Sequence, residues 1–128
     1  MNKDSASGLS RILRAIGHSR RGFAAAFRHE AAFRQELALV AVAVILATLI
    51  ADSLLIWLLL VGSGLLVLIV ELLNSAIEAV VDRFGGDWHE LSGRAKDMGS
   101  AAVMVSLALM GLTWLIVLWD TRFQAFLS

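Results

Sequence analysis

The pattern of charged and apolar positions divides the chain into one amphipathic segment followed by three long apolar segments. Uncharged residues run without interruption for fifteen positions over 37–51, eighteen over 53–70 and twenty-two over 98–119. A helix that crosses a bilayer needs about 20 mostly apolar residues. The first run reaches that length when it is extended back to residue 31, and the second when it continues to residue 82. We therefore expect three membrane-spanning helices over 31–51, 53–82 and 98–119, with a loop over 83–97.

Residues 6–29 follow a helical period with two faces of different character. The apolar face comprises Leu9, Ile12, Leu13, Ile16, Phe23 and Phe27, and the basic face Arg11, Arg14, His18, Arg21 and Arg28. Such a segment is typical of an amphipathic helix that lies in the membrane interface, with its arginines toward anionic headgroups. The alternative is a soluble helix packed on a partner. The adjoining apolar segment favours the membrane surface.

Composition narrows the class of protein. The chain has 128 residues, of which 59% are hydrophobic and 17% charged, with no cysteine and a net charge of +0. A small domain cannot bury that much apolar surface in water, because its surface fraction is large. The composition therefore predicts a single membrane-embedded domain over 1–128, and excludes a disordered chain, a disulfide-linked secreted domain and a zinc-thiolate protein. The balanced charge argues against a nucleic-acid partner.

The basic residues predict an orientation in the membrane. Seven of them precede the first uncharged run, three lie in 83–97, none lies in the first hairpin and one follows the last run. Cytoplasmic segments carry an excess of lysine and arginine. We therefore expect a multi-pass membrane protein, with the N-terminus and the 83–97 loop in the cytoplasm.

The second predicted span carries an unusual polar stripe. Glu71, Asn74, Glu78 and Asp82 are spaced three, four and four residues apart, which places them on one helical face. A charged side chain in a membrane costs about 2.5–3.5 kcal/mol on insertion scales and usually marks a functional site. Paired carboxylates suit Mg²⁺ with substrate phosphates, or general-base catalysis on a hydroxyl. The alternative is a polar stripe that holds helices together in an oligomer.

Two neighbouring features are candidates for the same site. Glu30 lies at the junction of the surface helix and the first span, where an ordinary interfacial charge is the alternative interpretation. Arg94 and Lys96 precede Asp97, which we expect to cap the third span, so they predict an anion site at a helix N-terminus. Basic residues are common in any cytoplasmic loop of a membrane protein, so Arg94 and Lys96 are only weak evidence for an anion site on their own.

Three segments carry a family resemblance. EAAFRQE at 30–36, ELLNSAIEAVVDR at 71–83 and HELSGRAKDMGSAA at 89–102 resemble the prokaryotic diacylglycerol kinase family. The resemblance implies an all-α, homotrimeric helical bundle with three membrane spans and an amphipathic surface helix in each subunit. It also implies transfer of the ATP γ-phosphate to diacylglycerol at the cytoplasmic face of the bacterial inner membrane, giving phosphatidic acid in phospholipid turnover, with Mg²⁺ as cofactor.

The resemblance also implies roles for individual residues. Glu71 matches the catalytic base, and Glu30 and Glu78 match the magnesium ligands. The positions that match nucleotide contacts are Arg11, His18, Glu30, Glu78, Asp87, Trp88, His89, Lys96 and Asp97. The positions that match the lipid site are Arg11, Ala15, Ser19, Arg20, Gln35, Glu71, Asn74 and Ser100. His18 and Trp88 stand where the family often has tyrosine, which changes the side chains available to the nucleotide.

Two other functions remain as alternatives. One is an undecaprenol kinase, which differs only in the lipid acceptor. The other is a small oligomeric ion or proton transporter that uses Glu71 and Glu78 as a relay. A transporter would need no phosphate-binding cations beside the acidic helix, so Lys96 favours the kinase.

Overall fold

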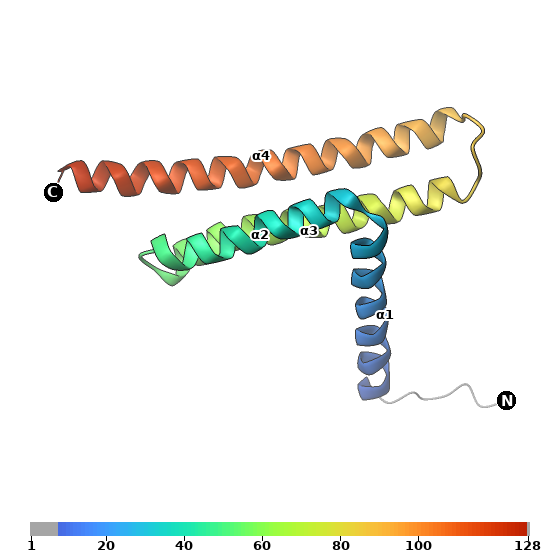
Figure 1. Ribbon diagram of the computed structural model, residues 1–128, viewed down its shortest axis with the longest axis horizontal. Coiled ribbons are helices and arrows are strands. Elements are labelled where there is room, and N and C mark those ends of the chain that lie inside the picture. The colour runs from blue at the N-terminus through green and yellow to red at the C-terminus, as the bar shows by residue number, and fades with distance from the viewer. Residues whose placement is uncertain (1–7, 128) are drawn as a thin grey trace.

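The computed structural model describes residues 8–127, with side chains to residue 120, and forms four α-helices without a β-strand over that range (Figure 1). The helices are α1 (Gly8–His29), α2 (Ala31–Ile50), α3 (Leu54–Asp82) and α4 (Glu90–Leu127). Helices α2, α3 and α4 run lengthwise with alternating direction, whereas α1 projects away from them, across their direction (Figure 1). The described part of the chain is therefore a helical hairpin extended by a third antiparallel helix, with one helix standing across its end.

Three of the helices are long and apolar enough to cross a membrane. These segments are Ala31–Ile50, Leu54–Asp82 and Glu90–Asp120. Many of their large apolar side chains point outward, including Leu49 and Leu54, which are 75% and 80% exposed. An apolar outer surface is stable in lipid and unfavourable in water. The expectation of an all-α membrane protein with three spanning helices is confirmed.

The last helix begins earlier than the hydrophobic pattern predicted. Helix α4 starts at Glu90, eight residues before the predicted span, so the connection between α3 and α4 comprises only residues 83–89. Asp97 consequently lies inside the helix, and the expectation that it caps the helix is wrong. Residues 90–97 are polar but rich in good helix formers, so the helix continues past the apolar segment. The His89 Nδ1 atom accepts a hydrogen bond from the Leu91 backbone N–H at 3.1 Å, next to the true start.

The first helix agrees with its predicted range over the described residues. Helix α1 is continuous from Gly8 to His29, and residues 6 and 7 of the predicted segment lie outside the described residues. The large apolar side chains of its apolar face are all exposed, from Ile16 at 52% to Leu9 at 66%. The arrangement leaves this face available to the membrane interface that the sequence predicted.

Helix α3 forms the centre of the bundle and packs against both α2 and α4. Small buried residues such as Ala43, Ala47 and Gly64 let the helices approach closely in the middle of the bundle. The hairpin between α2 and α3 is tied by a hydrogen bond from Trp57 Nε1 to Thr48 Oγ1 at 3.0 Å. Helix α2 ends at this hairpin and α3 begins there, but α2 has 20 residues and α3 has 29. Helix α3 therefore extends beyond α2 at the end of the bundle where α1 lies.

Candidate functional site

The polar stripe of α3 is buried at Glu71 and Asn74 and becomes exposed toward Asp82. Glu71 is 3% exposed and Asn74 is 9% exposed, whereas Glu78 is half-buried. The Asn74 Nδ2 amide donates a hydrogen bond to Glu78 Oε1 at 3.3 Å, and the Ser75 hydroxyl donates to Glu71 Oε1 at 3.5 Å. Burial of a carboxylate is costly unless it is partnered, so these contacts hold Glu71 and Glu78 in defined positions.

The unequal lengths of α2 and α3 bring Glu30 to this stripe. Glu30 is the residue before α2, and nine residues of α3 extend past that level, which is roughly 13 Å of helix at about 1.5 Å per residue. By this count Glu30 lies at the height of Asn74, between Glu71 and Glu78 along the axis. In agreement, the Glu71 carboxylate interacts electrostatically with the carboxylates of Glu78 and Glu30. The unequal helix lengths therefore bring Glu30 within electrostatic range of Glu71, which also interacts with Glu78.

The donor chemistry at this point fits a hard divalent cation. Among residues 8–127 there is no group of three or more His, Cys, Asp or Glu side chains arranged to hold a metal alone. Magnesium, however, usually binds through one or two carboxylates together with substrate phosphates and water. Glu30 and Glu78 both interact electrostatically with Glu71, and their carboxylate oxygens are suited to that mode of binding.

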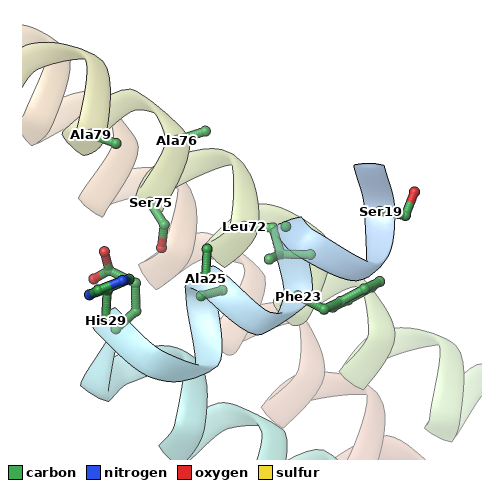
Figure 2. A pocket seen from close by; sticks show the side chains of 11 residues that line it. Ser19, Phe23, Ala25, His29, Leu72, Ser75, Ala76 and Ala79 are labelled. Atoms are coloured by element: carbon green, nitrogen blue, oxygen red, sulfur yellow. The ribbon is translucent and has the colours of Figure 1, made fainter. Parts of the chain in front are cut away.

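An apolar cavity of about 600 Å³ opens between α1 and α3. Phe23 and Ala25 of α1 lie on one side, and Leu72 and Ser75 of α3 on the other (Figure 2). Glu30 lies at its edge, and Ser75 connects it to Glu71 through the hydrogen bond described above. A cavity that is apolar along its walls and polar at one edge suits a lipid with a hydroxyl headgroup.

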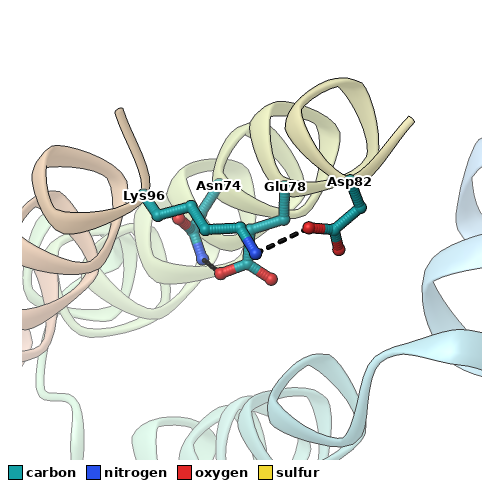
Figure 3. A network of polar contacts seen from close by, with 4 residues as sticks. All are labelled: Asn74, Glu78, Asp82 and Lys96. Carbon is teal, nitrogen blue, oxygen red and sulfur yellow. Dashed lines mark hydrogen bonds and ion pairs between the residues drawn. The ribbon is translucent and has the colours of Figure 1, made fainter. Parts of the chain in front are cut away.

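A second cavity, of about 620 Å³, lies at the loop between α3 and α4. Its lining is more polar and includes Asp82, Asp87, Trp88, His89 and Lys96. The Lys96 ammonium forms an ion pair with Asp82, and Figure 3 shows this pair beside Asn74 and Glu78 on the same face of α3. Helix α3 therefore lines both cavities: Ser75 faces the apolar one, and Asp82, at the end of the stripe, faces the polar, lysine-containing one.

Comparison with known proteins gives the same family that the motifs indicate. The model of the prokaryotic diacylglycerol kinase family matches residues 17–118. The chain is 52% identical to the diacylglycerol kinase of Escherichia coli K12 over 117 residues, which cover 91% of this chain and 96% of the relative. It is 53% identical to the diacylglycerol kinase of Pseudomonas aeruginosa over 112 residues, covering 88% and 91%. The chain belongs to the prokaryotic diacylglycerol kinase family.

More distant members match over nearly as much of the chain. The diacylglycerol kinase of Helicobacter pylori strain 26695 is 39% identical over 109 residues, which cover 85% of each protein. The region that the family model matches, residues 17–118, includes α2, α3 and most of α4, together with the acidic stripe and the loop cavity.

Several residues that the diacylglycerol kinase resemblance assigned are not brought together within one subunit. Arg11 lies in the first turn of α1, about 27 Å along the helix from His29 at about 1.5 Å per residue. Gln35, Asp97 and Ser100 are exposed and line neither cavity. Of the remaining α1 positions, Ser19 lines the apolar cavity, whereas Ala15, His18 and Arg20 do not. One subunit thus assembles the carboxylates and the loop, and leaves the N-terminal contacts apart.

Three residues that the sequence analysis did not assign have contacts in this region. Ser75 is buried and bonded to Glu71, and its spacing of four residues from Glu71 was a usable signal. Asp82 was part of the predicted stripe but had no assigned role, and it pairs with Lys96. Glu36 is buried, interacts electrostatically with Glu71, and its Oε2 atom has no hydrogen-bond partner among the described residues.

Proposed function

We propose that this chain transfers the γ-phosphate of ATP to the free hydroxyl of diacylglycerol and so produces phosphatidic acid. The observation that carries the proposal is the position of Glu71, a buried carboxylate on a helix that joins an apolar cavity to a polar one. Family membership supports the acceptor, because the relatives are named diacylglycerol kinases.

The residues account for the chemistry of the transfer. The Glu71 carboxylate accepts the proton of the lipid hydroxyl, and the hydroxyl oxygen attacks the γ-phosphorus of ATP. The bond from that phosphorus to the β,γ-bridging oxygen breaks, and ADP is released. Ser75 holds the Glu71 carboxylate in place. Lys96 neutralises phosphate charge after it exchanges Asp82 for the nucleotide. When held by Glu30 and Glu78, Mg²⁺ supplies further charge neutralisation on the ATP phosphates.

The two substrates approach from different sides of the stripe. The diacylglycerol headgroup occupies the cavity between α1 and α3, with its acyl chains in the bilayer, so only the glycerol region meets protein. The nucleotide occupies the loop cavity, where Asp87, Trp88 and His89 contact it. In this arrangement the lipid need not leave the membrane to react.

The complete site is shared between subunits of a homotrimer. Arg11 is too far along α1 to reach the carboxylates of its own chain, so its proposed contacts with nucleotide and lipid are made in a neighbouring subunit. The neighbouring subunit also receives the contacts of Ala15, His18 and Arg20, the other α1 positions that line neither cavity of their own chain. The reaction takes place at the cytoplasmic face of the inner membrane, because the loop cavity lies at the basic, N-terminal end of the bundle.

The test is activity of the purified full-length chain with radiolabelled ATP, using diacylglycerol and a polyprenol as separate acceptors. We expect labelled phosphatidic acid from the parent, and a loss of at least about 10²-fold in Glu71→Gln, which removes the base but keeps the volume. As the control, Asp52→Asn makes the same acid-to-amide change in the hairpin before α3, far from the site, and should retain activity. Labelling of the polyprenol alone contradicts the acceptor, and an active Glu71→Gln contradicts the base.

A further inference from the structure

Gly99 of α4 lies against the side chain of Asn74 of α3. Gly99 is buried, and a Cβ atom added there would overlap Asn74 Oδ1, while lying 3.3 Å from Asn74 Cγ and 3.8 Å from Asn74 Cβ. The other glycines of α4 differ, because a Cβ at Gly93 or Gly111 would meet nothing within 4 Å. The close approach is therefore specific to the level of Asn74.

This approach determines which way the Asn74 amide points. Its Oδ1 atom faces the bare backbone of Gly99 and, among the described residues, has no hydrogen-bond donor. Its Nδ2 group points the other way and donates to Glu78 Oε1 at 3.3 Å (Figure 3). The terminal amide torsion of asparagine is broad and does not select this direction by itself. The absence of a side chain at Gly99 leaves the space that the Oδ1 atom occupies.

We propose that Gly99 is a positioning residue that aims the Asn74 amide at Glu78, and so orients the carboxylate that binds the metal. The inference rests on the proposed role of Glu78 as a magnesium ligand. A methyl group at residue 99 would overlap the end of the Asn74 side chain but make only an ordinary contact with its Cβ, so the amide turns while the helices stay packed. Hydrogen bonds to metal-binding carboxylates typically change metal affinity or activity by about 10–100-fold.

The first test observes the amide directly and does not depend on activity. The chain has two asparagines, Asn2 and Asn74, so the Asn74 side-chain amide signal is assigned in a nitrogen–proton NMR spectrum by comparison with Asn74→Ser. We expect Gly99→Ala to shift this signal and Gly111→Ala, the matched control on the same helix, to leave it unchanged. An unchanged Asn74 signal in a folded Gly99→Ala variant overturns the proposal.

The second test measures the consequence for the metal. We expect Gly99→Ala to raise the magnesium concentration for half-maximal phosphorylation by roughly ten-fold, with Gly111→Ala near the parent value. In the Asn74→Ser background the same Gly99→Ala change should have little further effect on magnesium use or on the thermal unfolding midpoint, because the overlapping atom is gone. Equal effects in both backgrounds overturn the proposal.

The two tests separate this inference from the proposed function. A shifted amide with an unchanged magnesium requirement overturns the link from Gly99 to Glu78 while leaving the lipid kinase intact. If the parent chain phosphorylates no lipid alcohol, the proposed function fails, whereas the amide signal and the unfolding midpoints still decide whether Gly99 positions Asn74. Should Gly99→Ala fail to fold while Asn74→Ser/Gly99→Ala folds, the contact itself is supported.

Discussion

The Lys96 Nζ atom on α4 lies 2.6 Å from Oδ1 of Asp82, the last residue of α3. The pair joins the two helices at the edge of the loop cavity, yet its side chains are 42% and 64% exposed. Solvent screening makes exposed ion pairs weak contributors to stability. The pair is therefore weak enough for a phosphate to displace Asp82 and take the lysine.

Asp82→Asn should accordingly strengthen ATP binding. Without the competing carboxylate we expect the KM for ATP to fall by roughly two- to five-fold, the range that an exposed pair allows. The unfolding midpoint should stay close to the parent. Glu90→Gln removes a negative charge from the same end of the bundle without breaking this pair, and should leave KM unchanged. A raised KM in Asp82→Asn, or an equal fall in both variants, contradicts competition for Lys96.

Lys96 itself should be required for use of the nucleotide. We expect Lys96→Met to remove nearly all ATP-dependent activity, and Lys96→Arg to recover only part of it, because a planar guanidinium differs in geometry from a compact ammonium. The measurement is initial rate against ATP concentration. Normal ATP saturation in Lys96→Met would exclude the phosphate contact.

Glu30 and Glu78 should act as a unit in the use of magnesium. Each single change to glutamine should raise the magnesium requirement, and the double variant should lose much less than the sum of the two in free energy, because ligands of one ion couple strongly. Magnesium titrations of the parent, both single variants and the double variant measure this coupling. Additive losses with unchanged magnesium dependence would remove both residues from the metal site.

Ser75→Ala tests the hydrogen bond that holds Glu71. The serine is buried and its hydroxyl donates to Glu71 Oε1. We expect kcat to fall by roughly two- to ten-fold, because a hydrogen bond as long as 3.5 Å contributes about 0.5–1.5 kcal/mol. Ser106→Ala is the matched control, since that buried hydroxyl donates only to the Val103 carbonyl of its own helix. Equal activity in the two variants would show that Ser75 does not position the base.

Gly64 should be a determinant of stability rather than of activity. A Cβ atom there would lie 3.2 Å from Val40 Cγ2 and 3.6 Å from Met110 Cε, so Gly64 sits where α2, α3 and α4 meet. Gly64→Leu overpacks this point and should cost about 1–3 kcal/mol. Gly62→Leu, two residues away with open space, should cost little. Thermal unfolding in detergent compares the two, and equal midpoints would contradict the packing assignment.

The three apolar helices and α1 were predictable because their signals are local. Uncharged runs of the right length mark the apolar helices, and the helical period of 6–29 marks α1. The start of α4 was missed because the hydrophobic pattern reports where lipid begins, whereas Glu90 begins the helix outside the lipid. The acidic stripe was predictable from spacing alone, because all of its members lie on α3.

Other parts of the site depend on relationships between elements. Glu30 comes within electrostatic range of Glu71 only because α2 is shorter than α3. This relationship can be predicted only when the ends of both helices are known. The contact of Gly99 with Asn74 depends on the rotation of α4 about its own axis, and no periodicity reveals it. Predicting the ion pair between Asp82 and Lys96 would require knowing where α3 ends and where α4 begins.

The position of Glu71 along α3 has a consequence for the choice of acceptor. Counted from the hairpin, the number of residues up to Glu71 sets the depth of its carboxylate in the bilayer. A lipid alcohol presents its hydroxyl at a depth set by its own anchoring chains. We expect acceptors to be ranked by how well these two depths coincide, so that a water-soluble alcohol carrying the same group reacts poorly. Thinning or thickening the bilayer should then change that ranking without any change in the protein.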